Sequence, residues 1–210
     1  MKLYIVRHGE TQWNKEEVFR GRKDVTLNET GLRQAERTGA FFSDKKVEVV
    51  YSSPLQRATQ TASAICRATG AGLTLDDAFL DMDFGPWEGL SLANVRTGYP
   101  HEFETWQQFP QRFRMPGAET LTQVLRRIKG GLRRIEGQAN DVVVITTHRV
   151  ICKLLALHFL GASNRAFWRV KVDAASITLV EQHGSETAVT LLNQTIHLQD
   201  PVGTSECRDF

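Results

Sequence analysis

The chain has 210 residues, 41% hydrophobic and 24% charged, which is the balance of a soluble globular protein large enough to bury one core. Its 26 Lys and Arg residues against 24 Asp and Glu give a formal charge of only +2, and no basic block appears, so we expect no nucleic-acid partner. No apolar run approaches the ~18 residues of a transmembrane helix, so we expect no membrane partner.

The predicted elements alternate along the chain. A buried strand at 3–6 is followed by a helix at 30–42, a strand at 47–51 and a helix at 55–69 that ends at Gly70. The clearest helical spacing lies at 120–138, followed by a strand at 142–146, a helix at 150–160 and strands at 177–181 and 189–193. This alternation predicts an α/β fold, a three-layer α/β/α sandwich around a mostly parallel sheet.

The region 76–118 is different, because it is rich in Asp, Phe, Trp and Pro and has weak periodicity. We interpret it as a helical or loop lid inserted over a site, with aromatic residues that serve mainly as core or cover. We expect a single domain over 1–198 and a separate tail at 199–210. A homodimer is left open as the oligomeric state.

Three cysteines, Cys66, Cys152 and Cys207, are widely spaced and form no CxxC pair. This spacing excludes a disulfide framework and a thiolate zinc site. A reduced, cytoplasmic setting is therefore expected. The segment before Arg7 and His8 is too short for the apolar core of a signal peptide.

Charged side chains follow three of the predicted strands. Arg7 and His8 follow the first strand, Arg57 comes shortly after the second, and His148 follows the strand at 142–146. Ligands of open α/β sheets bind at the carboxyl ends of the strands. We therefore expect these four residues to converge on one site.

Such a group of residues suits phosphoryl transfer. A neutral imidazole is a nucleophile that can form a covalent intermediate. Arginine forks hold a phosphate dianion and stabilise the charge of the transition state. With Arg7, Arg57 and His148 as cations and no metal-ligand spacing such as HExxH, we expect neither a metal nor another cofactor.

The segment LYIVRHGETQWN at 3–14 resembles the signature of the histidine phosphatase, or phosphoglycerate mutase-like, superfamily. The resemblance continues in SSPLQRATQTA at 52–62, FGPWEG at 84–89, PGAET at 116–120 and VVVITTH at 142–148. The resemblance spans about residues 1–197. The whole series of motifs in this order is far more specific for the family than the RHGE motif alone. The implied fold is the α/β sandwich already predicted.

The resemblance also implies a role for each matching residue. His8 would be the nucleophile that becomes phosphohistidine, with Glu10 as the partner that orients it or, alternatively, as a surface ion pair. The phosphate pocket and its surroundings would be formed by Arg7, Asn14, Arg20, Gly21, Arg57 and His148.

The general acid of the family's commoner branch is a Glu four residues before the Gly of the GxWEG segment. Here that position is Asp81, whose protonated form would be favoured by the phosphate dianion and by apolar neighbours. Asp83 and Glu88 are the rival candidates for this acid.

Arg149 is a second departure, because most relatives have Gly after this His and the acid phosphatase branch has Asp. It either adds a cation to the pocket or points away.

The chain also lacks the longer insertion of the mutases, which favours water as the acceptor of the phosphoryl group. The implied activity is a metal-independent phosphomonoesterase acting on a small phosphorylated metabolite, similar to bacterial phosphoserine or α-ribazole phosphatases. Phosphoserine, α-ribazole phosphate and a sugar phosphate all remain open as substrates. The alternatives are a cofactor-dependent phosphoglycerate mutase and a non-catalytic phosphate-binding protein.

Overall fold

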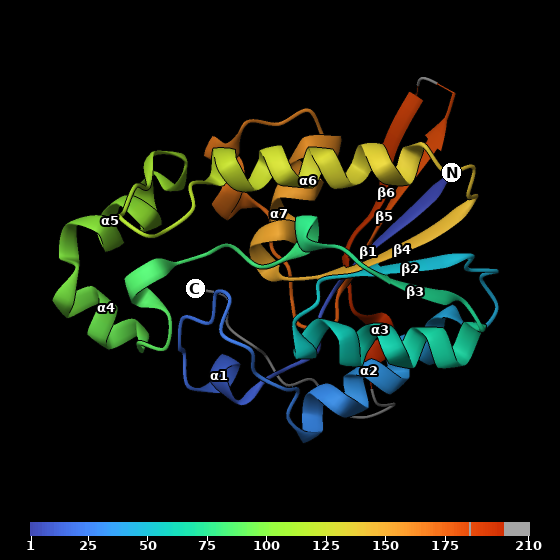
Figure 1. The fold of residues 1–210 in the computed structure, drawn as a ribbon, viewed down its shortest axis with the longest axis horizontal. Helices are drawn as coiled ribbons and strands as arrows, with labels where there is room; N and C mark the ends of the chain where they lie inside the picture. The colour runs from blue at the N-terminus through green and yellow to red at the C-terminus, as the bar shows by residue number, and fades with distance from the viewer. Residues whose placement is uncertain (185, 200–210) are drawn as a thin grey trace.

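The computed structural model describes residues 1–184 and 186–199, and within them a single sheet is flanked by helices on both faces (Figure 1). The predicted tail at 199–210, apart from Gln199, lies outside the described residues, as does Cys207. No helix in the described ranges is both long and apolar enough to cross a membrane.

The sheet has six strands in the order β3-β2-β4-β1-β5-β6. Their bounds are β1 Lys2–Arg7, β2 Val49–Ser52, β3 Gly72–Leu75, β4 Val142–Thr147, β5 Ile177–His183 and β6 Glu186–Gln194. Strands β1 to β4 pair in parallel with one another, whereas β5 pairs antiparallel with both β1 and β6. The sheet is therefore mixed but mostly parallel, and the predicted α/β fold class is confirmed.

Two helical layers cover the sheet, as the alternation of side chains along β1 requires. Leu3 and Ile5 pack into the cluster formed with α6 and α7, whereas Tyr4 and Val6 pack into the cluster formed with α2 and α3. Figure 1 shows these two helix pairs on opposite faces. The helices span α1 Gln12–Lys15, α2 Glu29–Phe42, α3 Gln56–Thr69, α4 Leu92–Gly98, α5 Pro100–Gln108, α6 Leu121–Glu136 and α7 Arg149–Phe159.

The elements of the sheet layers lie within a few residues of their predicted bounds, and the side chain of Asn28 caps the N-terminus of α2. Four elements were not predicted: β3, α1, α4 and α5. Strand β3 is an edge strand exposed along its whole length, so it lacks the apolar pattern of a buried strand. Helices α1, α4 and α5 have four, seven and nine residues, too few for a clear helical period.

Residues 76–118 leave the sheet beside the carboxyl ends of its parallel strands and carry α4 and α5 (Figure 1). Their aromatic side chains pack mostly inward, with Trp87 and Phe113 wholly buried, whereas Phe109 is 45% exposed. Most of these aromatic residues therefore belong to the same hydrophobic core as the apolar residues of α6 and α7.

Candidate active site

The two predicted histidines meet because β1 and β4 are adjacent parallel strands. Arg7 pairs with Thr147 in the register, and the backbone N–H of His8 donates to the carbonyl of Thr147 at 2.9 Å. His8 and His148, each one residue further on, place their ring centroids 5.2 Å apart. Both side chains are at most 1% exposed, at the carboxyl edge of the sheet.

The hydrogen bonding of His8 fixes its tautomer. Its Nδ1 lies 2.6 Å from the carbonyl oxygen of Gly9, which can only accept, so Nδ1 carries the proton. Burial, together with the charges of Arg57 and Arg7, holds the pKa of His8 well below its usual value of 6.5. His8 is therefore neutral near pH 7, and its Nε2 carries a lone pair, as a nucleophile requires.

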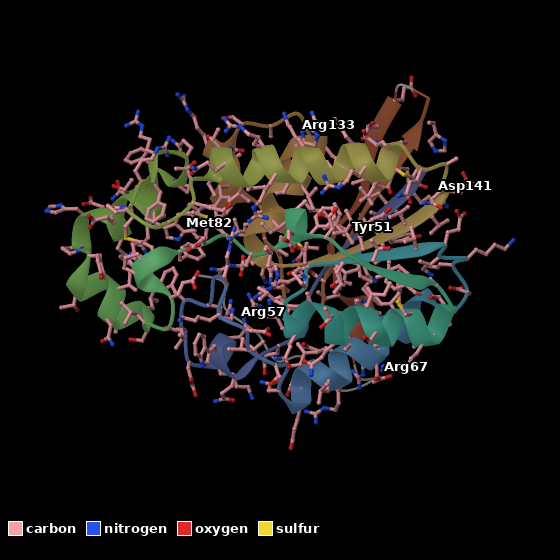
Figure 2. All side chains as sticks on the ribbon, in the orientation of Figure 1. Tyr51, Arg57, Arg67, Met82, Arg133 and Asp141 are labelled. Atoms are coloured by element: carbon pink, nitrogen blue, oxygen red, sulfur yellow. The ribbon has the colours of Figure 1, made fainter. Side chains whose placement is uncertain are left out.

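Arg57 lies in the first turn of α3, which follows β2, and its side chain is wholly buried. Figure 2 shows it near the start of α3, on the side of the molecule where the 76–118 segment leaves the sheet. Its guanidinium donates to the carbonyls of Gly21 and Lys23 at 2.7 and 2.8 Å, and its Nε–H donates to His148 Nδ1 at 3.1 Å. Arg57 is thus locked in one orientation by several elements.

His148 accepts at Nδ1, so its Nε2 carries the proton and lies 2.8 Å from the hydroxyl of Ser53. Burial and the charge of Arg57 lower the pKa of His148 well below 6.5. The lowered pKa contradicts the predicted cationic role of His148. The ring is neutral in the free protein, and the positive charge of the site comes from arginines.

Asp81 is the carboxylate that reaches this cluster. Its Oδ2 lies 3.3 Å from Arg57 Nη2 and 3.8 Å from His148 Nδ1, while its Oδ1 accepts the N–H of Met82 at 2.9 Å. The rivals Asp83 and Glu88 instead accept backbone N–H groups: Asp83 accepts from Gly85, and Glu88 accepts from Arg22 and Phe84. Of the three acids, Asp81 lines the adjacent cavity and the other two do not.

A cavity lies next to this cluster; Arg7 and Asp81 line it, whereas His8, Arg57 and His148 do not. Together with the open solvent at its mouth, it contains about 810 Å³ of empty volume. Five of the predicted binding residues line it together with Asp81: Arg7, Asn14, Arg20, Gly21 and Arg149. Burial and the charges of Arg7, Arg149 and Arg57 lower the pKa of the Arg20 guanidinium. Several cations therefore act on one space, an arrangement that favours an anionic ligand.

Two glycines keep the backbone close to this site. A Cβ on Gly9 would lie 2.6 Å from the carbonyl oxygen of Gly31, so the two chains touch through their backbones. Gly21 has a φ of +49°, and a Cβ there would meet the Glu88 carboxylate at 1.9 Å. Neither position has room for a larger residue.

Comparison with known proteins identifies the family. The family model described as "Histidine phosphatase superfamily (branch 1)" matches residues 3–195, which is most of the chain. The chain belongs to the histidine phosphatase superfamily. It is 32% identical to phosphoserine phosphatase 1 of Hydrogenobacter thermophilus over 94% of both chains.

Two solved structures have the same fold as this chain. The YhfR protein of Bacillus stearothermophilus superposes with a TM-score of 0.90 at 26% identity, over 94% of this chain and 99% of that one. The α-ribazole phosphatase of Shigella flexneri gives a TM-score of 0.85 at 22% identity, over 92% and 96%. The predicted family and its phosphoglycerate mutase-like fold are therefore confirmed.

One predicted contact of this histidine phosphatase is wrong. Glu10 does not orient His8, because its carboxylate accepts from Asn28 Nδ2 at 2.8 Å and lies 3.5 Å from Lys15 Nζ. The backbone carbonyl of Gly9 holds His8 instead, and a backbone partner leaves no signal in the side-chain pattern.

Sequence reasoning also missed Arg127 on α6. Its guanidinium donates to the carbonyls of Ala78, Leu80 and Asp81 at 2.8, 2.7 and 2.9 Å, and it pairs with Glu119 at 3.0 Å. Arg127 thus fixes the loop that carries Asp81. The PGAET motif at 116–120 contains its acidic partner, and this was the only available hint.

Proposed function

We propose that this protein is a phosphomonoesterase that hydrolyses a small phosphorylated metabolite through a phosphohistidine on His8. The observation that carries the proposal is the buried, neutral imidazole of His8, whose Nδ1 is held by Gly9 and whose neighbour Arg7 lines a cavity that Arg20 and Arg149 also line. A neutral nucleophile next to fixed guanidinium groups is what phosphoryl transfer requires.

In the first proposed step, His8 Nε2 attacks phosphorus and the bond to the leaving oxygen breaks. Asp81 gives its proton to that oxygen, so that the alcohol leaves neutral. In the second step water attacks the phosphohistidine, Asp81 takes the proton of the water, and inorganic phosphate leaves with His8 restored. Arg7 and Arg57 stabilise the equatorial oxygens in both steps, with His148 holding Arg57 in place.

The remaining cavity residues complete the proposed phosphate site. Arg20 adds a guanidinium, Asn14 and the backbone of Gly21 border the phosphate, and Arg149 lies beside them. Because arginines supply the positive charge, the reaction would need no metal, and activity should survive exhaustive EDTA treatment. A strict requirement for Mg²⁺ that is restored by adding the ion would contradict this. The same proposal treats 1–198 as one catalytic domain with 76–118 as its cover.

Phosphate release from a panel of phosphorylated metabolites tests the proposal. The wild type should turn over at least one of them without a bisphosphate primer, and His8→Asn should reduce turnover to background. His183→Asn, which alters an exposed histidine at the end of β5, is the matched control and should behave like the wild type. Activity that depends on a bisphosphate primer would indicate a mutase, and phosphate binding without turnover would indicate a binding protein.

A further inference from the structure

The cavity has a second wall that the phosphate does not need. Apolar side chains from separated segments line it, among them Phe19, Phe84, Phe103, Trp106, Val150 and Trp168. Ring contacts make this aromatic wall continuous, with centroids 5.3 Å apart for Phe19 and Phe84, 5.3 Å for Phe84 and Trp106, and 5.6 Å for Trp106 and Trp168. If the phosphate group of a phosphomonoester occupies the arginine side of the cavity, its alcohol part would lie against this aromatic wall.

The aromatic wall is already formed in the free protein. The indole N–H of Trp168 donates to the carbonyl of Trp106 at 2.9 Å, which ties the segment before β5 to helix α5 of the lid. Lys153 places its ammonium 4.6 Å from the Trp168 ring. A wall fixed in this way binds an apolar or aromatic group without an ordering cost, whereas a small polar alcohol leaves it unfilled.

Arg149 joins the aromatic wall to the phosphate side. It is the first residue of α7, directly after His148, and its neighbour Val150 belongs to the wall. Its guanidinium lines the same cavity and acts electrostatically on Arg20. An arginine fork pairs with a carboxylate or a second phosphate through two parallel hydrogen bonds.

Resting on the proposed function, we propose that the substrate is a phosphomonoester whose alcohol has an apolar, aromatic-sized body and a second anionic group that Arg149 binds. Arg149 is then the specificity-determining residue of this enzyme. The aromatic wall selects the size of the alcohol, and Arg149 selects its charge.

A matched pair of substrates tests this directly. Para-(2-carboxyethyl)phenyl phosphate and para-(3-methylbutyl)phenyl phosphate have nearly the same shape and leaving-group acidity, and only the first carries a carboxylate. We expect the wild type to prefer the carboxylated ester in kcat/KM by about tenfold or more, because a charge-assisted pair in a cavity is worth at least that factor. It should also prefer that ester over O-phosphoserine, which has the anion but no apolar body.

Three variants locate the preference. Arg149→Gln should bring the ratio of the two kcat/KM values to within about twofold of one, and Arg149→Lys should keep part of it. Arg165→Gln, which makes the same charge change at an exposed arginine, should leave the ratio unchanged. Because the readout is a ratio within one variant, a general loss of folded protein does not affect it.

Two results would overturn the inference. The first is a wild-type ratio near one, or a ratio that Arg149→Gln does not change. The second is a clear preference for O-phosphoserine, which would exclude the apolar body. Turnover of p-nitrophenyl phosphate that still depends on His8 would show in either case that the proposed hydrolysis stands and only the substrate class is wrong.

Discussion

Replacing Asp81 by Asn tests the proton donor with little change of shape. The amide keeps the size of the side chain and retains an oxygen to accept the N–H of Met82, which Asp81 Oδ1 now does at 2.9 Å. What disappears is the carboxyl group that can carry a transferable proton, whose Oδ2 lies 3.3 Å from Arg57 Nη2. The variant should therefore fold, because the amide oxygen can replace the carboxylate oxygens in the hydrogen bonds that the Asp81 side chain accepts.

The size of the effect follows from the leaving group. General acid catalysis contributes about 10²–10⁴-fold, or about 3–5 kcal/mol, when the leaving oxygen is a poor one. An alkyl phosphate needs the proton, whereas p-nitrophenolate leaves without it. We expect Asp81→Asn to reduce kcat on an alkyl ester by about 10²-fold or more, and on p-nitrophenyl phosphate by less than about tenfold.

The assay is the ratio of the two losses under single-turnover conditions, so that only transfer to the enzyme is followed. Asp83→Asn and Glu88→Gln are the matched controls, because both acids bond lid backbone and neither lines the cavity. Equal losses on both esters for Asp81→Asn would refute its role as the acid. A leaving-group dependence in either control would move the role to that residue.

Two further predictions concern charge and protonation. Because the pKa values of His8 and His148 are lowered, their neutral forms should persist below pH 6.5. After correction for the fraction of substrate present as the phosphate monoanion, kcat/KM should fall only below pH 6.5. A decrease that begins at or above pH 6.5 would contradict the lowered pKa values of the two histidines. The unfolded chain takes up protons more readily at these sites, so the free energy of unfolding should decrease from about pH 7 to about pH 5 in urea titrations; a rise would be inconsistent. Arg57→Met leaves Asp81 buried without its cation and should cost about 3–5 kcal/mol of unfolding free energy. Arg67→Met, at an exposed pair, should cost less than about 1 kcal/mol, and equal costs would refute the argument.

The sequence was sufficient for the elements with strong patterns. The layers of the sandwich and the convergence of Arg7, His8, Arg57 and His148 follow from strands that end in charged residues at one edge of a parallel sheet. Short elements such as α5 form because Phe103 and Trp106 are buried by tertiary contacts, and a nine-residue segment shows too little of that pattern by itself.

Side-chain partners were harder to predict than positions. Glu10 and Arg127 illustrate why, since one is drawn away by Asn28 and the other binds backbone carbonyls some 46 to 49 residues distant in the chain. The protonation of His148 was also beyond the sequence, because it depends on burial and on Arg57 donating to its Nδ1. Contacts of this kind are set by the packed structure.

The central claim is that His8 carries the transferred phosphoryl group, and trapping the intermediate tests it most directly. Wild-type protein is mixed with a radiolabelled phosphomonoester, quenched within one turnover and mapped by peptide. We expect acid-labile, base-stable label on the peptide that contains His8, and none in His8→Asn. Label on another residue, or wild-type turnover rates in His8→Asn, would contradict it.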